Sequence, residues 1–179
     1  LNLIDNKKFE FCWIIDFPMY QFDEVEKKII FSHNPFSMPR IDEKKFDEAD
    51  PLSILANQYD LVCNGLEISS GAIRNHLPDL MYKVFSKVGY SKDEVNNKFG
   101  GMIRALSYGA PPHGGIAFGL DRIVSMMAGE DSIREVIAFP KTQKSACLMT
   151  EAPSSIESDQ LRELGIRTRS VAGAVEQGG

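Results

Sequence analysis

The segment from Pro111 to Gly129 constrains the fold of this chain more than any other. Two prolines, a histidine and two glycines precede a short apolar run, and Gly119 separates that run from a helical pattern that begins at about Leu120. Apolar residues at helical spacing before a terminating glycine predict a helix up to Gly129. The apolar run is typical of a strand, so we expect a mixed fold in which strand and helix follow one another closely.

The end of this strand carries residues that can bind ligands. Asp121 and Arg122 follow Gly119 at the predicted helix start, but the segment lacks the Lys-Ser/Thr ending of a Walker motif and the G-x-G-x-x-G of a dinucleotide fold. A structural role also fits, because glycine permits tight strand–helix packing and an acid favours a helix N-terminus. The spacing alone leaves both interpretations open.

Three earlier segments predict strands and a loop. Phe9–Phe17 and Lys28–Ser32 are apolar runs on either side of an acidic turn, which indicates a hairpin or adjacent strands. Arg40–Asp50 is charged and has no apolar periodicity, so we expect an exposed loop. Asn57–Ser70 alternates, which predicts a strand with polar groups on its working face.

Two helices are expected next. Pro78 marks a helix start, and apolar residues at helical spacing continue until Gly89. Ser91 and Glu94 then form a capping-box pattern ahead of a second amphipathic helix, which ends near Gly109.

The composition fits one globular domain. The 179 residues are 43% apolar and carry 20 basic against 25 acidic side chains, a formal charge of -5. No basic tract is present, so nucleic-acid binding does not follow from charge. Cys12, Cys63 and Cys147 contain no C-x-x-C pair, so we expect buried free thiols in a reducing cytoplasm.

The sequence shows no membrane or export signal. No apolar stretch is long enough to cross a bilayer, and Leu1–Phe9 lacks the pattern of a signal peptide, so we expect a soluble cytoplasmic protein. The chain starts with Leu1 rather than Met, from which we expect a fragment of a longer protein.

Asp60 and Glu67 are candidate metal ligands. They are seven residues apart, so strict alternation along one strand would place them on opposite faces, whereas a bend near Asn64 and Gly65 would bring them together. Two carboxylates suit Mg²⁺ carried by a nucleotide phosphate. The alternative is a pair of solvated or capping acids.

Arg74 and His33 are candidate substrate-binding residues. Arg74 follows a turn of small residues that lets a ligand approach, and its guanidinium suits a carboxylate. A surface ion pair is the alternative for an isolated arginine. His33 can line a polar pocket, although a lone histidine is more often a hydrogen-bonded structural residue.

Seven strings, in order along the chain, resemble the last third of bacterial-type aspartyl-tRNA synthetases, which are class II enzymes. The similarity extends from about Phe11 to Arg167. The strings are Trp13–Pro18, His33–Phe36, Tyr59–Glu67, Gly71–Arg74, Tyr108–Gly115, Gly119–Arg122 and Val136–Thr142.

This resemblance implies an α/β (α+β) fold of the class II type, in which helices flank a mostly antiparallel sheet. The strands around Asp60 and Gly115 would lie side by side with the site at their polar ends. Residues 1–170 would be the C-terminal part of the catalytic domain, and residues 171–179 a flexible tail.

The resemblance also implies roles for single residues. Asp60 and Glu67 would hold Mg²⁺ against ATP, and Arg74 would bind the side-chain carboxylate of L-aspartate, with His33 near the amino acid. Arg122 would contact the ATP γ-phosphate. Gly119 and Asp121 belong to the same ATP-binding motif, and Arg122 and Glu67 would be the catalytic pair.

The implied reaction has two steps. The α-carboxylate of aspartate attacks the α-phosphate of ATP, which gives aspartyl-adenylate and pyrophosphate, and the aspartyl group is then transferred to the 3′ end of tRNA, either tRNA(Asp) alone or tRNA(Asn) as well. The family resemblance implies a cytoplasmic homodimer for the full-length enzyme.

Two departures from the family pattern affect these expectations. Asn34 stands where the family usually has a second histidine, and Ser69 and Ser70 replace two of three glycines, so pocket geometry or amino-acid affinity is expected to differ. The motif with the α-phosphate arginine is expected upstream of Leu1. We therefore expect these 179 residues alone neither to form adenylate at a useful rate nor to charge tRNA.

Two other functions remain open at this point. An asparaginyl- or lysyl-type sister enzyme shares the Gly119–Arg122 signature, although Arg74 suits a carboxylate better than an amide or an ammonium group. The second is a non-catalytic paralogue that acts as a binding module. The retention of all four ligand-facing residues, Asp60, Glu67, Arg74 and Arg122, argues against it.

Overall fold

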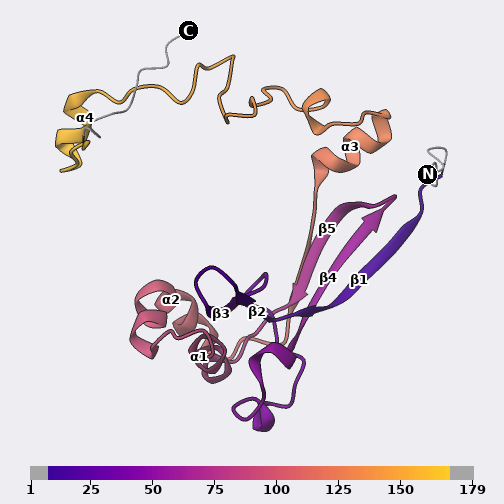
Figure 1. Cartoon of the computed structure of the whole chain (residues 1–179), viewed down its shortest axis with the longest axis vertical. Coiled ribbons are helices and arrows are strands. Elements are labelled where there is room, and N and C mark those ends of the chain that lie inside the picture. The colour runs from indigo at the N-terminus through magenta and orange to yellow at the C-terminus, as the bar shows by residue number, and fades with distance from the viewer. Residues whose placement is uncertain (1–7, 170–179) are drawn as a thin grey trace.

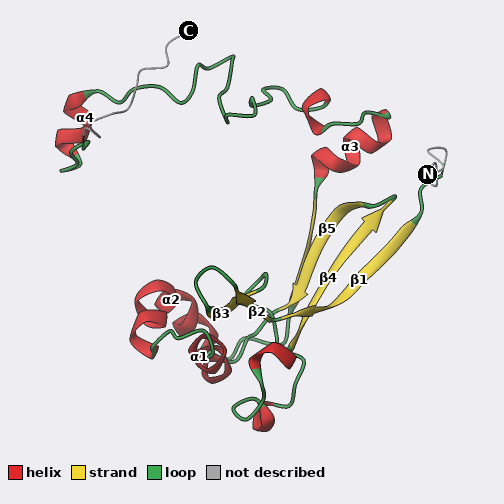
Figure 2. Cartoon of the chain, viewed as in Figure 1, coloured by secondary structure: helices red, strands yellow, loops and turns green. Residues whose placement is uncertain are grey.

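Four strands of the chain form one antiparallel sheet in the order β1-β4-β5-β6 (Figures 1 and 2). The computed structural model describes residues 8–169. The strands are β1 (Phe11–Pro18), β4 (Leu55–Cys63), β5 (Leu66–Ile73) and β6 (Gly114–Phe118). The class II type of sheet expected from the resemblance is confirmed.

The strand expected over Asn57–Ser70 is wrong in one respect, because this segment folds back on itself. Asn64 and Gly65 form a two-residue turn between β4 and β5, with φ angles of 48° and 83°. Two consecutive residues with positive φ are typical of a tight hairpin turn, and asparagine followed by glycine favours it. The segment is therefore most of a hairpin.

The hairpin expected between Phe9–Phe17 and Lys28–Ser32 is also wrong. The first of these runs, β1, pairs with β4, while β3 (Lys28–Phe31) pairs with β2 (Tyr20–Asp23) in a separate two-stranded sheet. The Asp23 carboxylate accepts hydrogen bonds from two backbone N–H groups of the turn, at 2.8 and 3.0 Å. This turn closes the hairpin locally, so β1 is left to pair with a distant strand.

The two expected helices are confirmed as α1 (Pro78–Ser86) and α2 (Lys92–Leu106). The reciprocal capping box of Ser91 and Glu94 is present at the start of α2. The Glu94 carboxylate accepts hydrogen bonds from the Ser91 backbone N–H and hydroxyl. These bonds, of which the backbone one has the larger effect, hold the pKa of Glu94 below its usual value.

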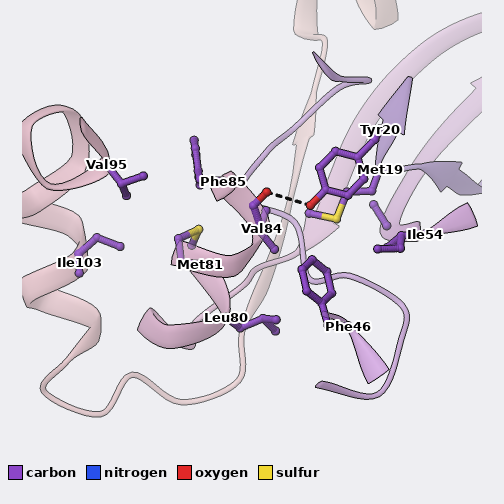
Figure 3. Packing of buried hydrophobic residues seen from close by; sticks show 11 residues of the cluster. Met19, Tyr20, Phe46, Ile54, Leu80, Met81, Val84, Phe85, Val95 and Ile103 are labelled. Carbon is purple, nitrogen blue, oxygen red and sulfur yellow. Dashed lines mark hydrogen bonds between the residues drawn. The ribbon is translucent and has the colours of Figure 1, made fainter. Parts of the chain in front are cut away.

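The core lies where α1 and α2 pack beside the β2–β3 hairpin, at one end of the sheet (Figures 1 and 3). Tyr20 is buried there, and its hydroxyl donates to the carbonyl of Val84 at 2.9 Å. Burial raises the pKa of Tyr20. The loop expected over Arg40–Asp50 contains a short 3-10 helix (Glu43–Lys45) and is not wholly exposed, because Phe46 is fully buried in this core.

The helix expected after Gly119 is confirmed as α3 (Leu120–Ala128), which lies at the opposite end of the sheet from α1 and α2 (Figure 1). Further along, the chain leaves the sheet, and α4 (Ser158–Glu163) lies apart from it. The other short 3-10 helices are Pro51–Ser53 and Ile133–Glu135. The tail expected at 171–179 lies outside the described residues, so the predicted domain boundary stays a prediction.

The three cysteines are free, as expected, but they are not all buried. Cys63 and Cys147 are buried, whereas Cys12 is exposed on β1, an edge strand of the sheet. Within residues 8–169, none of the helices has the length and apolar character needed to cross a bilayer.

Candidate functional site

The β4–β5 turn places Asp60 and Glu67 on one face of the sheet. Val62 lies directly opposite Glu67, and Asp60 is two residues before Val62 on the same strand. Residues opposite each other share a face, as do residues two apart along a strand. The bend expected at Asn64 and Gly65 is therefore present, and it reverses the parity that a single strand would impose.

A β-bulge then adds Arg74 to this face. The register shifts between Leu61 and Val62, so that Ser70, instead of Ser69, lies opposite Asp60. Without this extra residue, alternation from Glu67 would place Arg74 on the other face, because the two are an odd number of residues apart. We call the shared side, defined by Asp60, Glu67 and Arg74, the ligand face.

Backbone contacts fix Arg74 beyond the end of β5. Its N–H donates to the carbonyl of His113 at 2.9 Å, and it forms an isolated antiparallel bridge with Ser37. The next residue, Asn75, donates its N–H to the carbonyl of Phe36 at 2.8 Å. The loop after His33 and the loop before β6 therefore meet at Arg74, although they are far apart in the sequence.

His33 stands at the start of the first of these loops. It is exposed and lies edge-on to Phe17, with ring centroids 5.2 Å apart. The following residue, Asn34, uses its side-chain oxygen to accept the N–H of Phe36 at 2.9 Å. The departure from the family at Asn34 thus gives a local turn that holds the loop. In the described part of the chain, His33 and Arg74 share no hydrogen bond.

Arg122 joins the ligand face from α3. Its Nη1 donates to the backbone carbonyl of Glu67 at 2.6 Å and to the Glu67 carboxylate at 3.3 Å, and both side chains are about half-exposed. Gly119 positions the start of the helix, because its N–H donates to the carbonyl of Ile68 at 2.8 Å. Asp121 lies exposed in the first turn of α3, where an acid favours the helix dipole.

The expected adjacency of the strands around Asp60 and Gly115 is wrong. β5 lies between β4 and β6 and pairs with both. The error follows from treating Asn57–Ser70 as one strand, since its second half is the neighbour of β6. Glu67 and Arg122 nevertheless meet, because β6 passes directly into α3.

Two cavities border the site, and the sequence predicted neither. One, of about 430 Å³, contains Arg74, Asn75 and His113 in its lining. The other, of about 560 Å³, lies beside Arg122 and Ser125 of α3. Asn75 was not among the predicted site residues. Its place directly after Arg74 is the sequence feature that could have indicated it.

Comparison with known proteins identifies the family. The model described as tRNA synthetases class II (D, K and N) matches residues 2–143. The chain belongs to this family.

Individual relatives indicate which members of the family the chain resembles. The chain is 60% identical over 166 residues to an aspartate–tRNA(Asp/Asn) ligase of Pelagibacter ubique, which covers 93% of this chain and 28% of the relative. It is 58% identical over 164 residues to the ligase of the same name from Prosthecochloris aestuarii. This match covers 92% of this chain and 27% of that relative. The resemblance to bacterial-type aspartyl-tRNA synthetases is therefore confirmed, and the chain spans little more than a quarter of these relatives.

Solved structures agree on the fold. An aspartyl-tRNA synthetase from Entamoeba histolytica matches with a TM-score of 0.54 and 28% identity, over 75% of this chain and 23% of that one. An asparaginyl-tRNA synthetase of the same organism, in complex with asparaginyl-adenylate, matches with a TM-score of 0.54 over 76% and 26%, and at 22% identity it supports the fold alone.

Proposed function

We propose that the chain is part of an aspartate–tRNA ligase that activates L-aspartate with ATP and transfers it to the 3′ end of tRNA. The supporting observation is the ligand face, where a turn and a bulge align Asp60, Glu67 and Arg74 and where Arg122 reaches Glu67. The names of the relatives at 60% and 58% identity support the same assignment.

In the first step, an oxygen of the aspartate α-carboxylate attacks the α-phosphorus of ATP. The bond from this phosphorus to the oxygen bridging to the β-phosphate breaks, and pyrophosphate leaves. This chemistry needs alignment and charge neutralisation more than a protein nucleophile. Arg74 would hold the aspartate side-chain carboxylate with two parallel hydrogen bonds, which fixes the α-carboxylate for attack, while His33 lies near the amino acid.

Arg122 and its helix would bind the other end of ATP. Its Nη1 is held by Glu67, which leaves further N–H donors of the guanidinium for the γ-phosphate. Gly119 keeps the helix start close to β5, and Asp121 belongs to the same ATP-binding turn. The contact with Glu67 thus orients Arg122 before the nucleotide arrives.

Asp60 and Glu67 fit a magnesium ion carried by ATP. Mg²⁺ usually takes one or two protein carboxylates and fills its other positions with water and phosphate oxygens, and the ligand face offers two acids on adjacent strands. When bound, the ion would neutralise charge on the phosphates. Asp60 and Glu67 would hold it on the side of the sheet where Arg74 holds the amino acid.

In the second step, a terminal ribose hydroxyl of tRNA attacks the carbonyl carbon of the adenylate, and AMP leaves. We extend the proposal to tRNA(Asp) and tRNA(Asn), to a cytoplasmic homodimer and to a longer enzyme. The name that the relatives share supports both tRNAs, and the 28% of the first relative that this chain covers supports a longer enzyme. The cytoplasmic homodimer rests on the family resemblance alone. The 179 residues alone would neither form adenylate at a useful rate nor charge tRNA.

A chimera tests the proposal. In the chimera, the residues of this chain that align with the Pelagibacter ubique ligase replace the matching segment of that enzyme. Aspartate-dependent exchange between ATP and pyrophosphate is then measured. We expect exchange with aspartate, little with asparagine or lysine, and aspartylation of both tRNAs. Arg74→Ala should raise the KM for aspartate roughly 10- to 100-fold, since hydrogen bonds to charged groups are worth about 1.5–3 kcal/mol.

Matched variants separate site residues from surface residues. Arg122→Ala should lower exchange strongly, whereas Arg162→Ala should not, because Arg162 pairs with Asp159 on the distant α4. A folded chimera that prefers asparagine or lysine would identify a sister enzyme. A folded chimera without any exchange would favour a non-catalytic paralogue.

A further inference from the structure

The cavity beside Arg74 has an apolar wall that aspartate does not need. Its volume is about 430 Å³, within the range of roughly 300–1,000 Å³ typical of small-molecule pockets. The apolar wall consists of Phe36, Met81, Met102 and Leu106. We call this space the Asn75 cavity, after the buried polar residue in its lining.

The lining of this cavity contains a buried amide nitrogen that has no hydrogen-bond partner among the described residues. Asn75 is 2% exposed, and its Oδ1 accepts the N–H of Leu77 at 3.2 Å, which sets the amide orientation. Its Nδ2 has no partner among the described residues, and the same is true of Ser37 Oγ and His76 Nδ1. Ser37 and His76 do not line the cavity, but Ser37 pairs with Arg74 in a backbone β-bridge, and the ring centroids of His76 and His113 are 6.3 Å apart.

Buried polar groups in folded proteins are normally hydrogen-bonded, so an unpartnered buried amide in the lining of a cavity points to a ligand. The Asn75 amide and the Arg74 guanidinium offer donors, which suit a carboxylate. Among the described residues, no acidic side chain lines the cavity to pair with the ammonium group of an amino acid. Its apolar wall suits a hydrocarbon chain, and methionines adapt to varied shapes.

We propose that the Asn75 cavity binds a small apolar monocarboxylic acid. Its carboxylate lies at Arg74 and Asn75, and its chain lies against Met81, Met102 and Leu106. Binding itself does not depend on the proposed ligase activity. Competition with aspartate does, because it requires Arg74 to bind both compounds.

Hexanoate is the test ligand, and hexan-1-ol, which has the same chain length but no charge, is the control compound. The methionine methyl groups are labelled with ¹³C in the 179-residue chain and in the chimera, and each resonance is assigned by a Met→Leu substitution. Hexanoate should shift the resonances of Met81 and Met102. It should not shift those of Met127 and Met149, which are exposed and outside the cavity lining.

Two variants test the two halves of the cavity. Asn75→Asp keeps the oxygen that caps Leu77 but replaces the donor by a carboxylate, so hexanoate should bind at least about tenfold more weakly. Leu106→Trp should fill the apolar part and abolish the shifts, whereas Leu148→Trp, at an exposed position, should leave them unchanged.

Each result decides between specific claims. No shift of Met81 and Met102 in either protein, or equal binding of hexan-1-ol, overturns the proposal, and so does unchanged binding to a folded Asn75→Asp variant. If hexanoate shifts both methionines and raises the KM for aspartate, the cavity and the role of Arg74 are both supported. If it shifts them without competing, the cavity stands and the assignment of Arg74 to aspartate fails.

Discussion

Tyr59 of β4 lies against Gly71 of β5 so closely that no side chain fits at Gly71. A Cβ built there would stand 2.3 Å from Tyr59 Cε2 and 2.5 Å from the carbonyl oxygen of Gly115. The Tyr59 hydroxyl also donates to that carbonyl, at 3.1 Å. Tyr59 thus spans β5 and ties β4 to β6 on the side opposite the ligand face. The contact explains why glycine is kept at position 71, the last of the three positions at which the family pattern has glycine.

We predict that Gly71→Ala destabilises the chain. The added methyl group must displace the Tyr59 ring or the β6 backbone, and overpacking of this kind typically costs about 1–3 kcal/mol. Urea denaturation of the 179-residue chain, followed by circular dichroism, measures the change in the free energy of unfolding. In the chimera, aspartate-dependent exchange should fall as well, since β6 leads into the helix of Arg122.

Gly101→Ala is the matched control. Gly101 lies inside α2, and a Cβ there would meet nothing within 4 Å. Alanine favours a helix over glycine by up to about 1 kcal/mol, so this variant should be neutral or more stable. Equal stability of Gly71→Ala and Gly101→Ala would refute the role of the Tyr59 contact.

Local signals predicted α1, α2 and α3 well, missed the short α4, and predicted the strand pairing poorly. Pro78, the Ser91 capping box and Gly129 mark the ends of helices through short-range chemistry, which a sequence shows directly. Pairing of β1 with β4 depends on residues far apart in the chain, which no local pattern reveals. The turn residues Asn64 and Gly65 were noticed only as a bend, although this pair is a strong hairpin signal.

The sequence indicated the residues of the candidate site but not how they are brought together. The resemblance indicated Asp60, Glu67, Arg74 and Arg122, and the turn that unites the two acids was expected as a bend. The bulge that turns Arg74 to the same face has no clear sequence signal, because alternation counts residues and a bulge breaks the count. The Asn75 cavity was missed for a related reason, since its walls come from separate elements.

Ser69→Ala should stabilise the chain. Ser69 is 2% exposed, and its Oγ has no hydrogen-bond partner among the described residues, so the folded state carries the desolvation cost of a hydroxyl group. Alanine keeps the Cβ and removes that cost, which predicts a gain of about 1 kcal/mol in the free energy of unfolding. Ser70→Ala, at an exposed position, should change it little. A loss of stability in Ser69→Ala would show that the hydroxyl is satisfied.

Phe46→Ala should destabilise the chain more than any surface change. Phe46 is fully buried and anchors the charged loop to the core, and truncation of a buried phenylalanine typically costs about 3–5 kcal/mol. Phe139→Ala is the control, because that ring is exposed and lies outside the core. If urea denaturation gives similar losses for both variants, the loop is not anchored as described.

Asp60→Asn in the chimera tests the proposed magnesium site. Asparagine retains an oxygen ligand and the shape of the side chain but removes one negative charge, and the affinity of such sites depends on ligand charge. We expect the Mg²⁺ concentration for half-maximal exchange to rise roughly tenfold at fixed ATP, while the KM for aspartate changes little because Arg74 is untouched. Asp79→Asn is the matched control, since Asp79 lies in the first turn of α1, outside the four-stranded sheet. An unchanged Mg²⁺ dependence in Asp60→Asn would remove Asp60 from the metal site and leave Glu67 as its single acid on this face.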